Sequence, residues 1–361
     1  MTLLRRLTTA AVALTLLLAL LVSAALAAGT ALPTAELAFV AQKRDGGSDV
    51  YLLDAARLTF TPLTHSQFPK EAPIWSPTGQ RLAFTGSSWR GGSQSGVYVV
   101  DLDGHRLRRV AAGAAQQSSL TWSPDGRQIA YTSFHEGRFT VFALDVDDGQ
   151  MRTLAESSAA LGSPIWSPDG ARVALVAHSG SDDGLYLVAA TGGSPVRLTM
   201  QAAYAPTWSP DSRELAYIAT DKGNTEVFTL PADCGNTASG CVTAVRNLTQ
   251  NSAYDAFPVW SPDGRAIAFY STRDCQEVSL FMMALDGGPA RRLLSNCALS
   301  LRGTTENLAP SWSPDGREIA VTSQDGNMLN IYSVAVADGA VRRLTNLADF
   351  HVSVQYPAWR P

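Results

Sequence analysis

Few side chains in this sequence have the types and spacing of a catalytic or metal site. The histidines are scattered, and none has a second ligand at a spacing typical of metal binding. The segment Asp145–Gly149 resembles the start of a calcium loop but lacks the later ligands. Aspartates that recur in Ser-Pro-Asp-Gly segments are isolated from other carboxylates, and a turn explains them more simply. The sequence therefore predicts no metal, no cofactor and no catalytic residue.

A second group of residues stands out by position. Each residue lies just before one copy of a repeated Trp-Ser-Pro or Pro-x-Trp segment, and the side chains differ from copy to copy: Glu71, Gln117, Tyr204, Asp255, Asn307 and Gln355. Variable side chains on a repeated scaffold are typical of a specific binding site, since function concentrates on loops over a rigid framework. Trp89 and Arg90, in the Gly/Ser-rich loop 87–95, suit contact with a protein. These eight residues are the candidate partner-binding set, and ordinary solvated loop residues are the alternative.

The four cysteines are an even number, which in an exported chain predicts two disulfides. Cys234 and Cys241 flank an insertion between the third and fourth strands of one repeat. Cys275 lies between the second and third strands of the next repeat, and Cys297 follows its fourth strand. In a meandering sheet the loops that carry Cys275 and Cys297 emerge on one face, and the loop between Cys234 and Cys241 emerges on the opposite face. We therefore predict the pairs Cys234–Cys241 and Cys275–Cys297, with a metal site as the alternative.

The elements that must position these residues come from an internal repeat. Trp-Ser-Pro recurs at intervals of 42 to 52 residues, and a clipped seventh copy ends the chain: Trp75, Trp122, Trp166, Trp208, Trp260, Trp312 and Trp359. This period fits a unit of four short strands, the blade of a β-propeller. The tight turn Ser-Pro-Asp-Gly follows most copies, although Ser212 replaces the glycine in one. We expect the tryptophans to pack between blades rather than to stack on a ligand.

A strand of the form large-Ala-large follows each turn, with the alanine eight residues after the tryptophan, as in Leu82-Ala83-Phe84. Because alternate residues face opposite sides, one face of each sheet is bulky and the other is small. Leu37-Ala38-Phe39 has the same form but lacks a preceding tryptophan, and Tyr356–Trp359 supplies that missing first strand. The sequence thus predicts an all-β propeller of seven four-stranded blades, closed by pairing of the C-terminal strand with the N-terminal blade. Six or eight blades are the alternatives.

The unit Pro-x-Trp-Ser-Pro-Asp-Gly-x-x-Ile-Ala-Phe, followed by Ile-Tyr and Leu-Thr, resembles the TolB-like and WD-repeat-like propeller repeat. The same unit occurs in propeller domains of prolyl oligopeptidases. The resemblance covers residues 35–361 and implies the fold, whereas function does not follow from a fold. It also matches Asp255 to an aspartate found before Pro-x-Trp in TolB-like repeats. Two departures from TolB are expected here: seven blades instead of six, and no α/β domain before the first blade. The Gly-x-Ser-x-Gly elbow of the peptidases is absent.

The first residues have the layout of an export signal. Arg5 and Arg6 precede an uncharged run rich in leucine and alanine, which ends in Ala25-Leu26-Ala27. We expect a signal peptide over 1–27, a linker over 28–34 and the propeller over 35–361, with an uncleaved membrane anchor as the alternative. The formal net charge of −4 gives no reason to expect nucleic acid or an anionic membrane as a partner.

These features together predict a secreted or periplasmic, non-enzymatic propeller that binds a protein, peptide or glycan on its loop-rich face. The alternative is a hydrolase or lyase with acidic residues, such as Glu71 and Asp255, near the axis. Clustered carboxylates would favour that alternative, but the acids here are separated in sequence.

Overall fold

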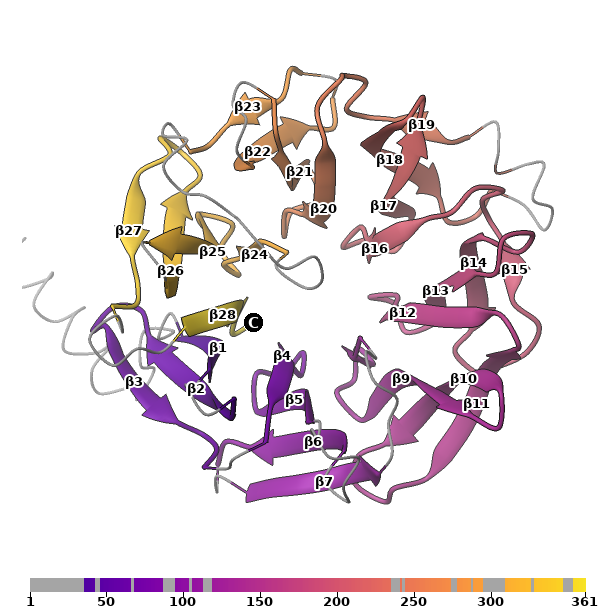
Figure 1. Cartoon of the computed structure of the whole chain (residues 1–361), viewed down its shortest axis with the longest axis horizontal. Coiled ribbons are helices and arrows are strands. Elements are labelled where there is room, and N and C mark those ends of the chain that lie inside the picture. The colour runs from indigo at the N-terminus through magenta and orange to yellow at the C-terminus, as the bar shows by residue number, and fades with distance from the viewer. Residues whose placement is uncertain are drawn as a thin grey trace, which may run out of the picture.

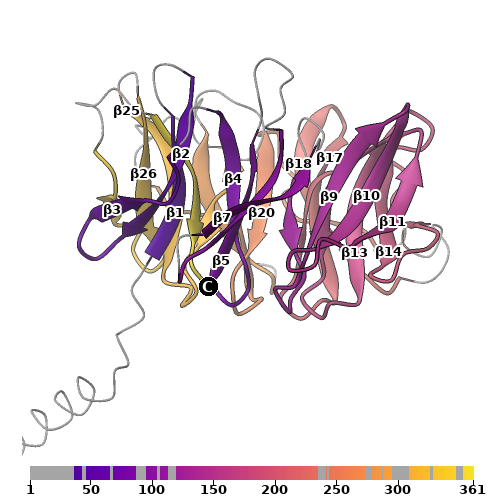
Figure 2. The ribbon, with the colours of Figure 1, turned by 90° about the horizontal axis from the view of Figure 1, so that it is seen from below.

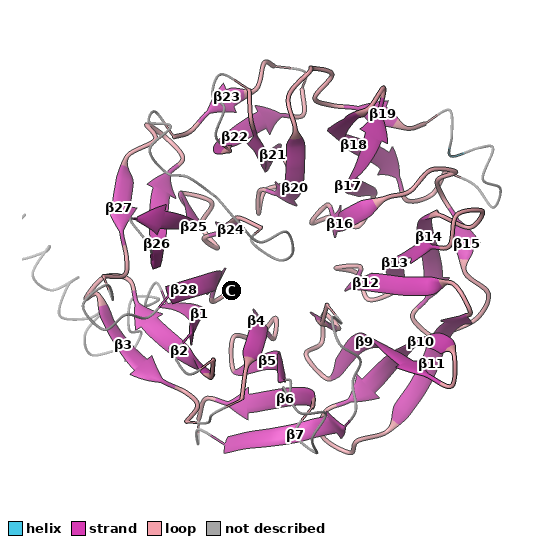
Figure 3. Cartoon of the chain, in the orientation of Figure 1, coloured by secondary structure: helices cyan, strands magenta, loops and turns pink. Residues whose placement is uncertain are grey.

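The computed structural model describes residues 36–42, 46–65, 68–86, 95–103, 106–112, 119–234, 241, 244–273, 278–286, 288–294, 309–325, 328–346 and 353–361. Seven four-stranded antiparallel sheets surround a central axis as the blades of a propeller (Figure 1). No helix is drawn in the described part of the chain (Figure 3). The predicted all-β fold and the seven blades are thus confirmed. The expected signal peptide and linker lie outside the described residues.

Each blade contributes one strand to each of four concentric positions. The innermost strands are β28 (Ser353–Trp359), β4 (Lys70–Trp75), β8 (Thr121–Trp122), β12 (Ala160–Trp166), β16 (Tyr204–Trp208), β20 (Asp255–Trp260) and β24 (Ser311–Trp312). The second strands are β1 (Glu36–Gln42), β5 (Arg81–Gly86), β9 (Gln128–His135), β13 (Arg172–His178), β17 (Glu214–Asp221), β21 (Ala266–Ser271) and β25 (Glu318–Asp325). The third strands are β2 (Ser48–Asp54), β6 (Gly96–Asp101), β10 (Arg138–Asp145), β14 (Gly184–Ala189), β18 (Asn224–Pro231), β22 (Ser279–Ala284) and β26 (Met328–Ala335). The outer strands are β3 (Thr59–Pro62), β7 (Arg106–Ala112), β11 (Met151–Ser157), β15 (Val196–Arg197), β19 (Arg246–Asn247), β23 (Arg291–Arg292) and β27 (Val341–Arg343).

Blade 1 contains both ends of the folded chain. Its strand order is β28-β1-β2-β3, whereas blades 2 to 7 each take four consecutive strands. Strand β28 pairs antiparallel with β1, with Leu37 opposite Trp359 and Ala38 opposite Ala358. The predicted closure is therefore confirmed, and it leaves no open edge between the first and last blades.

The blades pack through the large-Ala-large strands. Each of the seven apolar clusters joins the alanine face of one blade to the bulky face of the next. Ala83 of blade 2, for example, lies in one cluster with Ile129 and Tyr131 of blade 3. Across the closure, Ala320 lies with Phe39. A small side chain on one side lets the large side chains of the neighbour approach closely, which produces the dense packing of a protein interior.

The Ser-Pro-Asp-Gly turns link the first and second strands. In blade 3, the Gly126 amide donates to the Ser123 carbonyl (2.8 Å), and Gly126 has a φ of 69°. The Ser123 hydroxyl accepts from the Gln128 amide (2.9 Å) and donates to the Asp125 carboxylate. Serine and aspartate therefore stabilise the turn, and glycine supplies the left-handed conformation that it requires.

Ser212, which replaces the glycine in blade 5, also adopts a positive φ of 61°. Its hydroxyl accepts from the Asp169 amide (2.9 Å), and its carbonyl accepts from Arg172 Nη2 (3.0 Å), both in blade 4. These contacts between blades offset the backbone cost of a side chain at this position.

Candidate functional site

Successive strands are antiparallel, so the loops from the fourth strand of one blade to the first of the next emerge on the same face as the turns between second and third strands. We call this the loop face. It carries the exposed apolar side chains of Phe134, Met200, Tyr204 and Tyr254. Seen from the side, the strands run between this face and the opposite face of a flat disc (Figure 2).

A recurrent backbone irregularity marks the start of the inner strands. The residue three positions before the tryptophan has a positive φ in five blades: Ala72, Ser163, Ala205, Phe257 and Tyr356. A proline follows each of these residues, and the pairing with the second strand shifts register at the same place. Such a β-bulge turns the preceding side chains away from the regular alternation of the strand. It thereby separates the candidate residues on the loop face from the regular part of the strand.

The candidate residues that the structure describes fall into two environments. Glu71 and Tyr204, four positions before their tryptophans, are exposed. Asp255, five positions before its tryptophan, is fully buried. Gln355 lies in β28, but its side chain is not among those that the structure describes. Trp89, Arg90, Gln117 and Asn307 lie outside the described residues, so their roles stay predictions.

Tyr204 belongs to an aromatic pair on the loop face. Tyr204 is 47% exposed, and its ring stacks on the His178 ring, with centroids 4.7 Å apart and planes inclined by 18°. His178 ends β13 in blade 4, and Tyr204 begins β16 in blade 5. The pair therefore bridges two blades and presents a rigid, solvent-facing aromatic surface.

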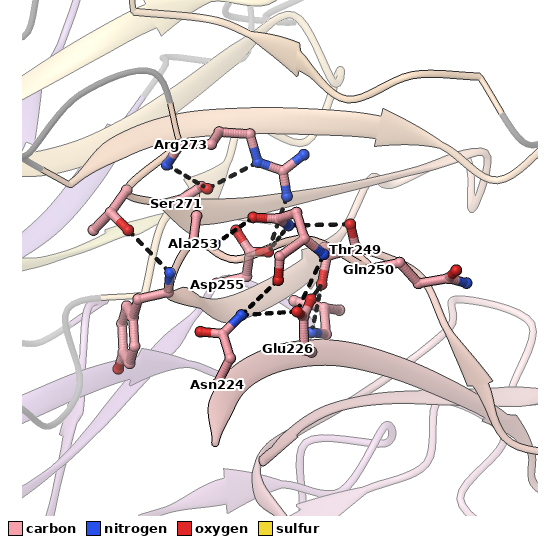
Figure 4. A network of polar contacts seen from close by, with 12 residues as sticks. Asn224, Glu226, Thr249, Gln250, Ala253, Asp255, Ser271 and Arg273 are labelled. Atoms are coloured by element: carbon pink, nitrogen blue, oxygen red, sulfur yellow. Dashed lines mark hydrogen bonds and ion pairs between the residues drawn. The ribbon is translucent and has the colours of Figure 1, made fainter. Parts of the chain in front are cut away.

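Asp255 is the centre of a polar network between blades 5 and 6 (Figure 4). Its Oδ2 accepts from Arg273 Nη2 (2.9 Å) and from Asn251 Nδ2 (2.6 Å). The Arg273 Nε also donates to the Ser271 hydroxyl (2.9 Å). Asp255 Oδ1 is buried and has no hydrogen-bond partner among the described residues. The carboxylate thus makes an internal ion pair and does not face solvent.

The network continues through Glu226 of β18. The Thr249 hydroxyl donates to one carboxylate oxygen of Glu226, and Asn224 Nδ2 donates to the other (2.8 Å). Asn224 Nδ2 also donates to the Asn251 carbonyl (2.7 Å), which fixes the loop that leads to blade 6. Sequence reasoning did not single out these residues. The recurrent Leu-Thr pair could have indicated them, because its threonine accepts from a third-strand amide here and in three other blades.

A second buried ion pair lies between blades 1 and 2. Lys70 Nζ is 3.3 Å from Asp49 Oδ1, and the two side chains are 0% and 3% exposed. The ammonium lies 4.4 Å from the Phe68 ring centroid, and the Asp49 carboxylate also accepts from Thr64 (2.9 Å). Lys70 lies five positions before its tryptophan, as Asp255 does, so the same buried position carries a cation in one blade and an anion in another.

Other sequence predictions have clear structural outcomes. The disulfide Cys234–Cys241 is confirmed, with a Cα–Cα distance of 4.8 Å, whereas Cys275 and Cys297 lie outside the described residues. Asp145 accepts from the Asp147 amide (2.9 Å), as expected of a turn. Among the described residues no cluster of three or more His, Cys, Asp or Glu side chains could hold a metal ion.

The blades have the geometry and the repeat of a known propeller family. The TolB beta propeller domain matches residues 91–243, which is less than half of the chain. This match assigns residues 91–243 to blades of the TolB type. A 63-residue segment is 35% identical to the Tol-Pal system protein TolB of Xanthomonas campestris pv. campestris, covering 17% of this chain and 14% of that protein. A 65-residue segment is 43% identical to the uncharacterized peptidase YuxL of Bacillus subtilis, covering 18% of this chain and 9% of that protein.

The structural similarity extends over most of the chain. Oligogalacturonate lyase in complex with manganese superposes with a TM-score of 0.66 at 18% identity, covering 84% of this chain and 86% of the lyase chain. At this identity the similarity shows the shared fold alone. Segments similar to this chain thus occur both in a Tol-Pal protein and in a relative named as a peptidase, and a similar fold occurs in a lyase. Within the described segments, no helix has the length and apolar character needed to cross a bilayer.

Proposed function

We propose that this chain is an extracytoplasmic propeller that binds a protein partner on its loop face. The observation that carries the proposal is the set of large exposed side chains there: Phe134 (50% exposed), Met200 (60%), Tyr204 (47%) and Tyr254 (44%). Aromatic side chains and methionine are enriched at protein interfaces, because they offer a large contact area with few rotatable bonds. The stacked His178 ring holds Tyr204 in place before any partner arrives.

The difference between blades supports a single, specific orientation of the partner. Glu71 and Tyr204 are exposed at equivalent positions of blades 2 and 5, but one is acidic and the other aromatic. A pseudo-symmetric ring with different side chains at equivalent positions offers an asymmetric surface. Such a surface distinguishes one docking orientation from the other six.

Two further observations support this assignment. The basic start, apolar run and Ala25-Leu26-Ala27 motif favour export to the periplasm or beyond. One relative with the same blade type is named as a Tol-Pal system protein, which is consistent with work in a protein assembly. Trp89 and Arg90 remain part of the proposed partner-binding set.

The test is recovery of partners by the immobilised protein from an envelope extract of the source organism. The Tyr204→Ala/Tyr254→Ala variant should recover at least about tenfold less of the partner, since loss of an interface anchor costs about 2 kcal/mol. The control Met151→Ser/Val341→Ser removes equally exposed apolar side chains from the outer strands β11 and β27. Equal recovery by the two double variants would refute binding at the loop face.

A hydrolase or lyase is the second candidate, and the observation that favours it is Asp255 Oδ1, which has no hydrogen-bond partner among the described residues. The relative named as a peptidase and the lyase of similar fold make the assay worthwhile. Wild type and Asp255→Asn should be incubated with peptide, ester and acidic oligosaccharide substrates. Turnover by wild type that is absent from an Asp255→Asn variant shown to be folded by circular dichroism would replace the binding proposal with an enzymatic one.

A further inference from the structure

A cleft of about 390 Å³ lies between blades 4 and 5, near the loop face. Tyr217 of β17 and Phe228 of β18 form its aromatic wall, with ring centroids 5.6 Å apart. Met200, which is 60% exposed, and half-buried Val245 add apolar surface. Asp221 is the one formally charged residue among the described residues that line the cleft.

The Tyr217 hydroxyl has no hydrogen-bond partner in the part of the chain that the structure describes. The side chain is fully buried, and its oxygen makes no hydrogen bond to any described residue. The equivalent residue is phenylalanine in three other blades, at Phe39, Phe84 and Phe269, so blade packing does not need the hydroxyl. Burial raises the pKa of Tyr217, which keeps the hydroxyl protonated and able both to donate and to accept a hydrogen bond. A buried polar group of this kind costs free energy unless something in the cleft binds it.

Blade 6 shows how the equivalent space is filled within the molecule. Phe269 and Phe281 correspond to Tyr217 and Phe228, since both pairs are opposite residues of the second and third strands. The guanidinium of Arg273 lies over these two rings, 5.2 and 5.3 Å from their centroids. It also pairs with the Asp255 carboxylate at 2.9 Å. In blade 6 the cation of Arg273 therefore lies against the two rings on one side and pairs with the Asp255 carboxylate on the other.

Blade 5 has the rings and a carboxylate, but none of its described residues places a cation here. Asp221 occupies the position of Arg273, thirteen residues after the tryptophan of its blade. Its carboxylate accepts from Asn247 Nδ2 at 3.4 Å and forms no ion pair with any described residue. Nearby Arg197 is engaged elsewhere, since it donates to the Thr199 carbonyl (2.8 Å) and lies 5.9 Å from the Tyr186 ring centroid.

We propose that the cleft between blades 4 and 5 binds an alkylguanidinium group from outside the chain, stacked against Tyr217 and Phe228 and paired with Asp221. The planar guanidinium suits aromatic faces and carboxylates together, and the flexible Met200 adapts to its alkyl stem. A ligand anion is disfavoured here by the Asp221 carboxylate. The site shares Met200 with the partner-binding surface proposed above, but it does not require that a partner binds there. Its occupant is either a free guanidino compound or an arginine side chain of another protein.

The experiment compares n-propylguanidinium with n-propylurea, which has nearly the same shape but no charge, by NMR titration of the full-length protein. Wild type should bind the cation with a millimolar Kd and at least about tenfold more tightly than the urea, as a charge-assisted hydrogen bond provides. The Asp221→Asn variant should lose this preference. The Tyr217→Phe variant should weaken cation binding about three- to tenfold. Glu136→Gln, which removes an exposed charge from a hairpin of blade 3, should change nothing.

Two peptides, acetyl-Gly-Arg-Gly-amide and its citrulline counterpart, distinguish the sources of the group. Binding of the arginine peptide at least as tight as that of n-propylguanidinium identifies a protein side chain, whereas binding of the free compound alone identifies a small molecule. Equal affinity for the urea and the cation, unchanged cation affinity in Asp221→Asn, or no spectral change with either compound would overturn the proposal. Circular dichroism of both variants checks folding, and a crystal soak of wild type locates the ligand without any substitution.

Discussion

The indole Nε1 of Trp75 donates a hydrogen bond of 2.8 Å to the backbone carbonyl of Ala358, across the interface between blades 1 and 2. Equivalent bonds run from the tryptophan of one blade to the inner strand of the preceding one: Trp122 to Ile74 (3.2 Å), Trp208 to Ile165 (3.1 Å), Trp260 to Thr207 (3.3 Å) and Trp312 to Val259 (3.3 Å). Trp166 bonds within its own turn, and the indole N–H of Trp359 has no partner among the described residues. The repeated tryptophans thus link blades, as predicted.

The contrast between Trp75 and Trp359 gives a matched test of this link. Both side chains are buried, but only Trp75 has a partner for its indole N–H. Trp75→Phe should therefore lower the free energy of unfolding by about 1 kcal/mol more than Trp359→Phe does. Urea denaturation of the two variants measures the difference. An equal loss of stability would show that the indole hydrogen bond does not stabilise the interface between blades 1 and 2.

Arg273→Ala should be strongly destabilising. The substitution leaves the fully buried Asp255 carboxylate with Asn251 as its remaining donor, and breaking a buried ion pair costs about 3–5 kcal/mol. It also removes the cation from the rings of Phe269 and Phe281. Because the space left matches the side chain, n-propylguanidinium should restore part of the lost melting temperature, and n-propylurea should not.

Arg213→Ala is the control for this experiment. The Arg213 side chain is 83% exposed, and its Nε lies 3.9 Å from Oδ2 of Asp211, whose side chain is 61% exposed, so we expect a change below about 0.5 kcal/mol. A similar small change in Arg273→Ala would show that the Asp255 network contributes little to the stability of blades 5 and 6.

Tyr217→Phe should leave the folded protein as stable as wild type or more stable, by up to about 1–2 kcal/mol, in the absence of ligand. The variant removes a buried hydroxyl that has no described partner, and the repeat already uses phenylalanine at this place. Tyr131→Phe is the matched comparison, because the Tyr131 hydroxyl contacts Met151 Sδ at 3.2 Å. Chemical denaturation that shows Tyr217→Phe to be the less stable of the two would mean that the hydroxyl has a structural partner.

The turns predict a loss of stability in acid. Hydrogen bonds from the turn serines hold the pKa values of four aspartates below their usual range: Asp125, Asp211, Asp263 and Asp315. A depressed pKa in the folded state stabilises the fold above the unfolded value of about 3.9, and this contribution disappears as the pH falls through the folded value. We expect less than about 1 kcal/mol from each turn, because water screens these exposed carboxylates.

Asp263→Asn should therefore flatten the acid limb of the stability profile, measured by thermal unfolding between pH 2 and 7. Blade 2 supplies the reciprocal variant, since Thr78 stands at the aspartate position of its turn. Thr78→Asp should steepen the acid limb. Parallel profiles for wild type and both variants would show that the serine–aspartate bonds do not couple folding to protonation.

The sequence allowed a correct prediction of the fold because its signals are local and repeated. Proline, aspartate and glycine define the turns, alanine and large residues alternate along the second strands, and Trp359 completes the pattern that begins at Leu37. Each signal depends on the immediate neighbours in the chain, which a sequence displays directly.

The candidate site was only partly predictable, because the bulge changes which side chains face solvent. Glu71 and Asp255 both come just before Pro-x-Trp, yet they lie one position apart in the repeat, and one is exposed while the other is buried. Lys70 was missed for the same reason, since it lies at the buried position. In the sequence, Tyr217 has the pattern of a core aromatic residue, as Phe269 does. The structure distinguishes the two, because the Tyr217 hydroxyl lies beside a cleft.

The pairing of β28 with β1 also determines the order in which the ring is completed. Arg360 forms an ion pair with Glu36 across 324 residues of sequence, so blade 1 depends on one of the most distant contacts that the chain makes. The entropy cost of joining distant segments grows only slowly with the length between them, but contacts of such high order form late and slow the search. We therefore expect blades 2 to 7 to form in part before blade 1. The pairing of β28 with β1 should then be the rate-limiting step of refolding.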